Sequence, residues 1–287
     1  MKVLVLGANG QLGYEFLNFL KDKAEVFPFN HAQLDVLSFL GLSKVISEIS
    51  PDVVINCAAY TKVDQAEKEL TLAYKINAIG ARNVSFTSLK AKSKIVYFST
   101  DYVFDGIKGA PYNEFDIPNP ISVYGKSKLL GEYYTKEHNP DHLILRISWL
   151  YGINGSNFVK TIIKLSKEKS ELRVVNDQVG TPTYTLDVVK QTWQLIQKDS
   201  IGLYHSANIG QTTWFEFAKR IVEKLKLNAK VKPIKTEEFP ALAKRPSFSV
   251  LENHLLKIEN KNTMQNWEEA FEDFVETYRK ELLNGES

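Results

Sequence analysis

Short apolar runs alternate with longer amphipathic segments along the first half of the chain. The runs are rich in Val, Ile, Leu and Phe and are short enough to be strands buried on both faces. They cover residues 2–7, 25–30, 52–58, 94–100 and 142–148. Helical patterns lie between them at residues 11–22, 38–49, 64–91 and 122–137. This alternation predicts parallel βαβ units, and hence an α/β fold with a doubly wound, Rossmann-type parallel sheet.

The second half has fewer elements and longer irregular stretches. Beyond residue 150 we expect strands at 172–176 and 202–208, helical or amphipathic segments at 185–198, 214–227 and 267–283, and a proline-marked loop over 233–248. We therefore expect a main domain over residues 1–150 and a smaller part over residues 151–287, partly interleaved with the last elements of the sheet.

The composition is that of an ordinary globular protein, with 44% hydrophobic and 24% charged residues. The 36 Lys and Arg residues nearly balance the 34 Asp and Glu residues, so the net charge of +2 does not suggest binding to nucleic acid or membrane. No apolar run approaches the ~20 residues of a membrane-spanning helix, and the apolar start is too short for a signal peptide. We expect a cytoplasmic protein.

Glycines recur where the first predicted strand meets the first helix, in Gly7-Ala8-Asn9-Gly10-Gln11-Leu12-Gly13. Glycine permits a tight turn and lets backbone N–H groups at the positive helix N-terminus approach a pyrophosphate. Inside a βαβ unit, the motif predicts a dinucleotide site in residues 1–150, formed by Gly7, Asn9, Gly10, Gln11 and Leu12. The alternative is a turn that carries glycine for backbone reasons alone.

The second predicted strand should end beside the adenosine ribose of the dinucleotide. NAD-preferring sites often have an acidic residue there to bind the 2′-hydroxyl. This chain has Asn30 followed by His31, which would not repel a 2′-phosphate, although no arginine lies nearby in the sequence to bind one. We therefore favour NADPH as the cofactor, with NADH also accepted. Asp35 is either an adenine contact from the loop before the next helix, or an N-cap or loop carboxylate.

Three residues with catalytic chemistry follow. Thr100 ends a predicted strand, and ligands bind at the carboxyl ends of parallel strands in open α/β sheets. Tyr124 and Lys128 are four residues apart, which places both side chains on one face of a helix. A phenol with a pKa near ~10 is a poor acid at neutral pH, but a nearby ammonium favours the phenolate and lowers that pKa. This spacing of Tyr and Lys also occurs by chance in solvated helices. The prediction that Tyr124 and Lys128 are catalytic therefore depends on the glycine motif and on Thr100.

Together these residues resemble those of the extended short-chain dehydrogenase/reductase superfamily. The resemblance implies an oxidoreductase whose catalytic residues are Thr100, Tyr124 and Lys128, with Lys128 also holding the nicotinamide ribose. Asn77 matches the helix asparagine that often completes this group, and its alternative is a polar residue of the helix interior.

Longer segments resemble one family of that superfamily, the dTDP-4-dehydrorhamnose reductases. They fall in order along nearly the whole chain, at residues 57–64, 99–106, 123–132, 146–152, 176–183 and 244–246. The first segment contains Ala58, Ala59 and Tyr60, which the resemblance places beside the cofactor. The family reduces the C4 keto group of a dTDP-linked 4-keto-6-deoxy sugar with NAD(P)H.

The resemblance also implies roles in the reaction. Tyr124 would donate the proton to the forming alkoxide, and Thr100 would hydrogen-bond the reacting oxygen. The implied substrate-binding residues are Val63, Thr100, Asp101, Tyr102, Trp149, Asn157 and Arg245. Trp149 has an alternative as a core aromatic at a strand end. Arg245 is implied to pair with the substrate diphosphate, and its alternative is a solvated loop cation.

One departure from related enzymes favours reduction over elimination. Sugar-nucleotide dehydratases of the superfamily have an Asp-Glu pair after the strand-end Thr, because removal of water needs a further acid and base. Here Asp101 is followed by Tyr102. Some relatives hold magnesium at a dimer interface through a first-helix glutamate that matches Glu15. The second half lacks convincing matching carboxylates, so we expect a solvated Glu15 and no metal.

Other functions stay open at this point. The chain could reduce another 4-keto nucleotide sugar, because the motifs do not define the stereochemistry of the pocket. An epimerase that recycles its NAD is a weaker alternative. A non-catalytic NADP-binding regulatory subunit is a further one, since a fold alone does not guarantee activity. The intact Thr100, Tyr124 and Lys128 argue against the subunit. We expect a monomer or a homodimer.

Overall fold

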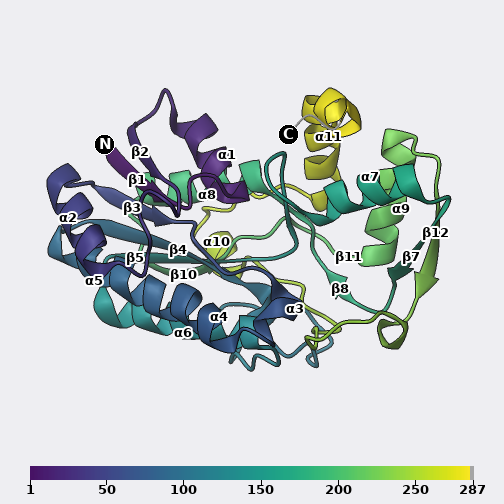
Figure 1. Cartoon of the computed structure of the whole chain (residues 1–287), viewed down its shortest axis with the longest axis horizontal. Coiled ribbons are helices and arrows are strands. Elements are labelled where there is room, and N and C mark those ends of the chain that lie inside the picture. Colours follow the sequence, from purple (N-terminus) through teal and green to yellow (C-terminus); the bar gives the residue numbers. More distant parts are fainter. Residues whose placement is uncertain (285–287) are drawn as a thin grey trace.

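A six-stranded parallel sheet forms the larger part of the molecule, and a smaller lobe lies beside it (Figure 1). The computed structural model describes residues 1–284. Across the sheet the strands run β2-β1-β3-β4-β5-β10. Their bounds are β1 (Lys2–Leu6), β2 (Glu25–Phe29), β3 (Val53–Asn56), β4 (Lys94–Thr100), β5 (His142–Ile147) and β10 (Gly202–His205). All neighbouring pairs are parallel, which confirms the predicted α/β class and the Rossmann-type sheet.

Helices cover both faces of this sheet, so every residue of β3 and β4 is buried. Successive strand residues point to opposite faces. Val96 therefore packs with Phe16 and Val188 on one face, while Ile95 packs with Leu42 on the other. The covering helices are α1 (Gln11–Leu20) and α8 (Thr185–Gln197) on the first face, and α2 (Phe39–Ile49), α5 (Ala81–Lys90) and α6 (Val123–His138) on the second (Figure 1).

The helical pattern predicted over residues 64–91 is interrupted once, at residues 67–69. The short α3 (Val63–Ala66) comes first, and then a continuous helix made of α4 (Leu70–Tyr74), the π-helix η1 (Lys75–Gly80) and α5. The wider π-helical turn contains Asn77, whose amide reaches the backbone of Tyr60 at 2.8 and 3.1 Å. The helix widens from α to π where this tertiary contact forms.

An aromatic cluster fills the smaller lobe, with Tyr151, Tyr184, Phe217, Phe271 and Phe274 all buried. The main elements around it are α7 (Phe158–Glu168), β7 (Glu171–Val175), α9 (Trp214–Leu225), β12 (Lys230–Ile234) and α11 (Trp267–Asn284). Neither α7 nor β12 was predicted, and β12 occupies the start of the predicted loop over 233–248. The shorter elements are η2 (Asp101–Val103), β6 (Leu150–Tyr151), β8 (Val179–Gly180), β9 (Thr183–Tyr184), β11 (Thr212–Thr213), η3 (Thr236–Glu238) and α10 (His254–Ile258).

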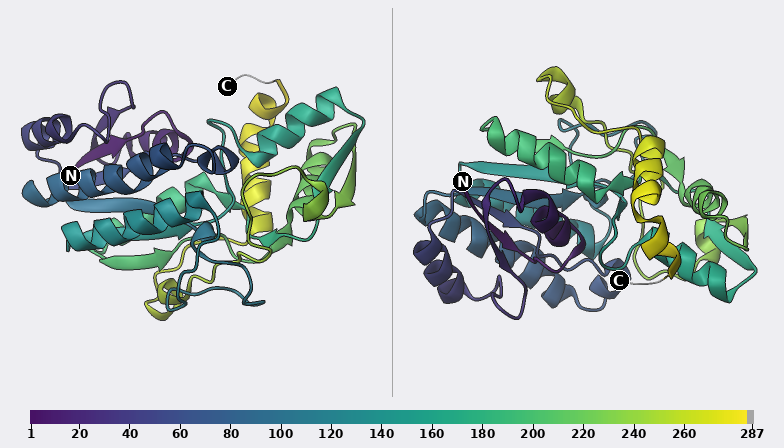
Figure 2. Two further views of the ribbon diagram at one scale, coloured as in Figure 1. Left: turned by 60° about the horizontal axis from the view of Figure 1, so that its bottom comes forward. Right: turned by 90° about the horizontal axis from the view of Figure 1, so that it is seen from above.

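The chain passes between the sheet and the lobe more than once. After β5 it forms α7 and β7 in the lobe, and it then returns through α8 to β10 at the edge of the sheet. Seen from above, α11 stands between the sheet and the rest of the lobe (Figure 2). The domain boundary at residue 150 stays a prediction. No helix within residues 1–284 has the length and apolar character needed to cross a bilayer.

Candidate active site

The predicted catalytic residues gather at the carboxyl edge of the sheet. Thr100 is the last residue of β4, and Asp101 opens η2 directly after it. Tyr124 lies in the first turn of α6, where Ser122 caps the helix by accepting a hydrogen bond from Gly125 N at 3.1 Å. Strands β2 and β3 flank β1 on opposite sides, so the order of the strands reverses at β1. Open α/β sheets bind ligands at such a reversal of strand order.

The glycine motif after β1 has no room for side chains at two positions. Gly7 has a φ of +71°, and a Cβ there would lie 2.8 Å from the Ala58 nitrogen. A Cβ on Gly13 would lie 2.2 Å from the Gly7 oxygen. Gly10 is the N-cap of α1, and no described side chain caps this helix. Its free N-terminal N–H groups fit a pyrophosphate, the anion expected of a dinucleotide.

Ala58, Ala59 and Tyr60 follow the end of β3, beside this motif. Ala58 packs against Gly7, Ala59 is exposed, and Tyr60 is buried. Asn77 is 1% exposed, binds the Tyr60 backbone and donates to Ser127 Oγ at 2.9 Å. Its amide therefore joins η1, the end of β3 and α6, and the cofactor contacts of these residues stay predictions.

At the other end of the predicted dinucleotide site, Asn30 and Asp35 form local turns. Asn30 Oδ1 accepts a hydrogen bond from Gln33 N at 3.1 Å, and Asp35 Oδ1 accepts one from Leu37 N at 2.9 Å. Asp35 therefore lies in a loop and accepts a hydrogen bond from the backbone of that loop. Contacts of either side chain with adenosine stay predictions.

Asn157 links the glycine motif to the smaller lobe. Its Nδ2 donates to Gln11 Oε1 at 3.1 Å, and its Oδ1 caps α7 by accepting a hydrogen bond from Lys160 N at 3.1 Å. Beside it, Asn154 Nδ2 donates to the Asn9 oxygen at 2.8 Å. The loop before α7 therefore holds two of the predicted cofactor residues, while the predicted substrate contact of Asn157 stays untested.

Lys128 is a buried cation on the face of Tyr97. Its Nζ lies 4.1 Å from the centre of that ring, and the residue is 3% exposed. Burial lowers the pKa of Lys128 to about 7, while the charge of Glu132 raises it. Glu132 is itself held by Arg146 through two hydrogen bonds of 2.8 Å. Burial and Glu132 therefore act on the charge of Lys128 in opposite directions.

The pKa of Tyr124 is raised to about 12, opposite to the direction that its spacing from Lys128 predicts. Burial is the largest cause, a hydrogen bond with Thr100 lowers the pKa, and the charge of Asp101 raises it. Burial outweighs the effect expected of Lys128, whose ammonium lies over Tyr97. The Tyr124 phenol keeps its proton at neutral pH, which suits a proton donor.

Thr100 and Asp101 are almost inaccessible to solvent, at 4% and 2% exposed. Thr100 Oγ1 lies 3.0 Å from Asp101 Oδ1 and accepts a hydrogen bond from Tyr102 N at 3.2 Å. Asp101 Oδ2 is buried without a hydrogen-bond partner among residues 1–284. Burial raises the pKa of Asp101 to about 6, against the neighbouring Ser249 and Thr100 side chains, which lower it.

Trp149, a predicted part of the sugar pocket, stacks on Trp214. The ring centres are 3.4 Å apart and the planes differ by 6°. Trp149 has a φ of +42°, a left-handed conformation that is unfavourable for a bulky residue. Its indole lies against Gly180, where a Cβ would be 2.3 Å from the ring. Trp149 and Val63 are both half-buried, and their contacts with a sugar stay predictions.

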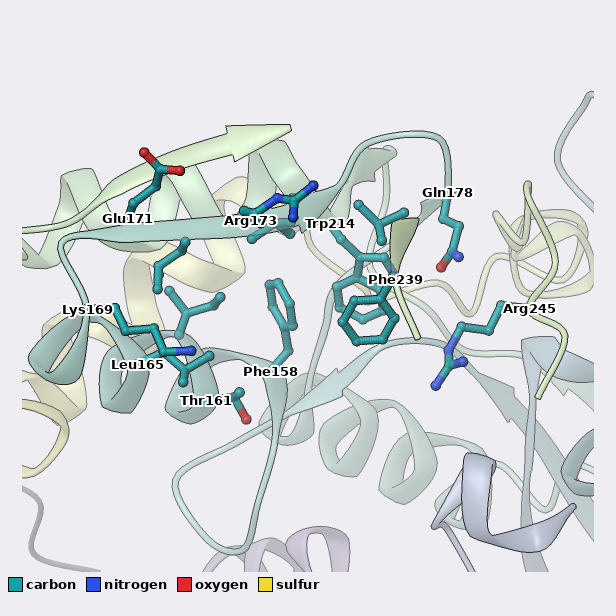
Figure 3. Close-up of a pocket in the computed structure, with 14 residues that line it drawn as sticks. Phe158, Thr161, Leu165, Lys169, Glu171, Arg173, Gln178, Trp214, Phe239 and Arg245 are labelled. Carbon is teal, nitrogen blue, oxygen red and sulfur yellow. The ribbon is translucent and has the colours of Figure 1, made fainter. Parts of the chain in front are cut away.

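A cavity of about 560 Å³ lies in the smaller lobe, between α7, β7 and the chain that follows η3 (Figure 3). Phe158, Trp214 and Phe239 form part of its wall, and Arg245 lies at one end. Arg245 donates to both carboxylate oxygens of Asp64, at 3.1 and 2.6 Å. The arginine implied to bind a diphosphate is therefore paired within the chain and is not a solvated cation, and its diphosphate contact stays a prediction.

The prediction of a solvated Glu15 is wrong. Glu15 is 3% exposed, and its Oε2 accepts a hydrogen bond from Thr185 Oγ1 at 2.8 Å. Burial raises its pKa, because α8 packs against α1 at this point. Among residues 1–284, no three His, Cys, Asp or Glu side chains are arranged to hold a metal ion.

The chain is similar over nearly all its length to one protein family. The sequence model of the RmlD substrate binding domain family matches residues 1–280. The chain belongs to this family. This confirms the resemblance that the sequence segments indicated. The part of this chain that the family model matches contains every predicted site residue.

Solved and curated relatives agree with this membership. The chain is 45% identical to a dTDP-4-dehydrorhamnose reductase from Clostridium acetobutylicum, with a TM-score of 0.95 over 97% of this chain and 100% of that one. A dTDP-4-dehydrorhamnose reductase from Bacillus anthracis, solved in complex with NADP, is 46% identical, with a TM-score of 0.94 over 96% and 99% of the two chains. The spore coat polysaccharide biosynthesis protein SpsK of Bacillus subtilis is 41% identical, over 96% of this chain and 97% of SpsK.

Two residues of the site were not assigned from the sequence. Asp64 ends a segment that resembles the reductases, but nothing in that segment indicates Arg245 as its partner. Trp214 follows Thr213, the N-cap of α9, and the amphipathic pattern there suggested only a helix. An aspartate in a matched segment and a tryptophan at a helix start were the available signals.

Proposed function

We propose that this chain reduces the C4 keto group of dTDP-4-dehydro-L-rhamnose to give dTDP-L-rhamnose, using NADPH and also accepting NADH. Membership of the RmlD family and the NADP-bound relative support this proposal. The observation that carries it is that Thr100, at the carboxyl end of β4, lies close enough to Tyr124 for its side chain to lower the pKa of the phenol.

The chain's own residues divide binding and chemistry between them. The N-terminus of α1, with Gly7 and Gly10, would hold the pyrophosphate, and Lys128 the nicotinamide ribose. When bound, the reduced nicotinamide supplies the hydride. Trp149 and Val63 would form the wall beside the sugar, and Arg245 would pair with the diphosphate.

Tyr124 acts as the proton donor in this proposal. A phenol with a pKa of about 12 is protonated at neutral pH, so its proton is available for the oxygen at C4 as negative charge develops there. Thr100 hydrogen-bonds the same oxygen. Lys128, four residues further along α6, would stabilise the phenolate that remains.

The test is to mix the purified protein with dTDP-4-dehydro-L-rhamnose and to follow NADPH and NADH absorbance in parallel. We expect oxidation of NADPH in proportion to the dTDP-L-rhamnose formed, and slower or equal oxidation of NADH. Turnover of only a different 4-keto nucleotide sugar would replace the substrate. Binding of NADPH with no turnover of any keto sugar would favour the non-catalytic subunit. The cytoplasmic location, the absence of nucleic-acid and membrane partners, and the monomeric or homodimeric state stay predictions.

A further inference from the structure

The Thr100 hydroxyl has a single proton and several acceptors around it. Its Oγ1 lies 3.0 Å from Asp101 Oδ1, and a hydrogen bond from Thr100 would stabilise the Tyr124 phenolate. The proposed reaction adds a third acceptor, the oxygen at C4 of the substrate. A hydroxyl donates one hydrogen bond and accepts two. The direction of the Thr100 hydroxyl therefore depends on its neighbours.

An ionised Asp101 would turn Thr100 away from the reaction. A carboxylate only accepts hydrogen bonds, and charge-assisted bonds are stronger than neutral ones. The Thr100 proton would then point at Asp101 Oδ1, leaving only a lone pair toward the substrate. A keto oxygen cannot donate to that lone pair, so Thr100 could not support the developing negative charge.

We propose that Asp101 works in its protonated form, donating to Thr100 Oγ1 and so directing the Thr100 proton at the oxygen on C4; this rests on the proposed function. Thr100 Oγ1 then accepts from Asp101 and from Tyr102 N and donates to the substrate, which uses its full hydrogen-bonding capacity. Asp101 keeps its proton throughout the reaction. It is a positioning residue that acts through Thr100.

The surroundings of Asp101 shift its ionisation toward the neutral acid. The residue is 2% exposed, and Oδ2 has no hydrogen-bond partner in the described chain. Burial raises the pKa of Asp101 to about 6. The titratable side chains that face the Asp101 carboxyl are those of Tyr102 and Tyr124. The Asp64–Arg245 ion pair acts on Tyr102, and Ser249 lies beside the carboxyl. A bound substrate would exclude more water and raise the pKa of Asp101 further.

The test is the pH dependence of kcat for the wild type and Asp101→Asn, between about pH 5 and about pH 9. Because the neutral acid is the working form, the wild-type rate falls as Asp101 ionises, while the Asn amide donates at every pH. We expect the ratio of the variant's kcat to the wild-type kcat to rise by up to about tenfold per pH unit above the pKa of Asp101. The effect of Lys128 ionisation is shared by both proteins and cancels in this ratio. A ratio that is constant with pH would overturn the proposal.

A second pair of variants tests whether Asp101 acts through the Thr100 hydroxyl. In a Thr100→Val background the hydroxyl is gone, so Asp101→Asn should leave the pH profile unchanged. A ratio that still rises with pH in that background would show that Asp101 acts by another route and would also overturn the proposal.

A substrate-independent readout separates this proposal from the proposed function. The infrared difference spectrum between wild type and Asp101→Asn, with NADP and dTDP bound at about pH 5, below the Asp101 pKa of about 6, should contain the carbonyl stretch of a protonated carboxylic acid. Lack of turnover together with this band would reject the reductase and retain a neutral Asp101. Lack of the band would reject the neutral Asp101 whatever the activity.

Discussion

Arg245 and Asp64, 181 residues apart, form a bidentate ion pair at the end of the cavity. Asp64 Oδ1 also accepts hydrogen bonds from the backbone N–H groups of Leu242 and Ala243, each at 3.0 Å. The hydrogen bond with Arg245 is the largest of the effects that lower the pKa of Asp64. One carboxylate thus holds both the guanidinium and the loop that carries it.

Asp64→Asn should weaken binding of the nucleotide sugar. Without the carboxylate, Arg245 loses its fixed orientation toward the diphosphate, and we expect KM to rise about tenfold, the equivalent of ~1.4 kcal/mol, with a smaller change in kcat. Steady-state kinetics measure both constants. Asp177→Asn is the matched control, because Asp177 also binds loop backbone, at Thr236 N, but pairs with no arginine within residues 1–284. Equal rises in KM for the two variants would mean that loop anchoring, rather than Arg245, is responsible.

Tyr124→Phe should abolish most turnover while leaving cofactor binding intact. The loss of the proton donor is expected to lower kcat by about 10²–10⁴-fold. NADPH titration by fluorescence should give a Kd close to that of the wild type. Tyr133→Phe is the control, because Tyr133 lies on the same helix and is 56% exposed. A Tyr124→Phe variant with near-wild-type turnover would remove Tyr124 from the mechanism.

Trp214→Leu should disturb the substrate pocket through Trp149. The stacked indoles hold Trp149 in a left-handed backbone conformation, and the loss of an aromatic pair costs ~0.5–1.5 kcal/mol. We expect KM for the nucleotide sugar to rise several-fold. The same rise should follow Gly180→Ala, because the new methyl group would collide with the Trp149 ring. Double variants with Trp149→Leu should show no further loss, and additive effects would mean that Trp214 acts independently.

Glu15→Gln should stabilise the fold at neutral pH. Burial raises the pKa of the Glu15 carboxyl above its usual value of 4.5. Its contribution to stability is present below the unfolded-state pKa and is lost as pH rises through the folded-state pKa. The Gln amide stays neutral and still accepts the Thr185 hydrogen bond, so the free energy of unfolding should rise relative to wild type near pH 7 but not near pH 4.

Urea unfolding at the two pH values measures this difference. Glu48→Gln on α2 is the control, because Glu48 is an exposed helix glutamate. A gain in stability that is the same at both pH values would show that the ionisation of Glu15 is not its cause.

The strands of the sheet were predictable because burial on both faces leaves an unbroken apolar run. The run predicted at residues 94–100 coincides with β4, in which all seven residues are buried. Helix α7 also had a local signal, an Asn157 N-cap followed by buried Val159, Ile162 and Ile163, which was not recognised. The strand β12 contains Pro233 and is defined by its pairing with β7, which no local pattern shows.

The parts of the site that could not be predicted depend on distant partners. Glu15 was expected in solvent because its partner Thr185 is 170 residues away. The ion pair between Asp64 and Arg245 also could not be predicted, because these residues are 181 positions apart in the chain. The direction of the Tyr124 pKa was also misjudged, since spacing places Lys128 on the same helix face but says nothing about burial or the Tyr97 ring. Motifs located the residues, and tertiary packing decided their ionisation.

The most direct test of the account is to follow the hydride itself. NADPH carrying deuterium at nicotinamide C4 would be incubated with the protein and dTDP-4-dehydro-L-rhamnose, and the sugar product analysed by NMR and mass spectrometry. We expect dTDP-L-rhamnose with one deuterium at C4 for each NADPH oxidised when the label is on the transferred side. An unlabelled product, or a changed sugar with no net oxidation of NADPH, would contradict it.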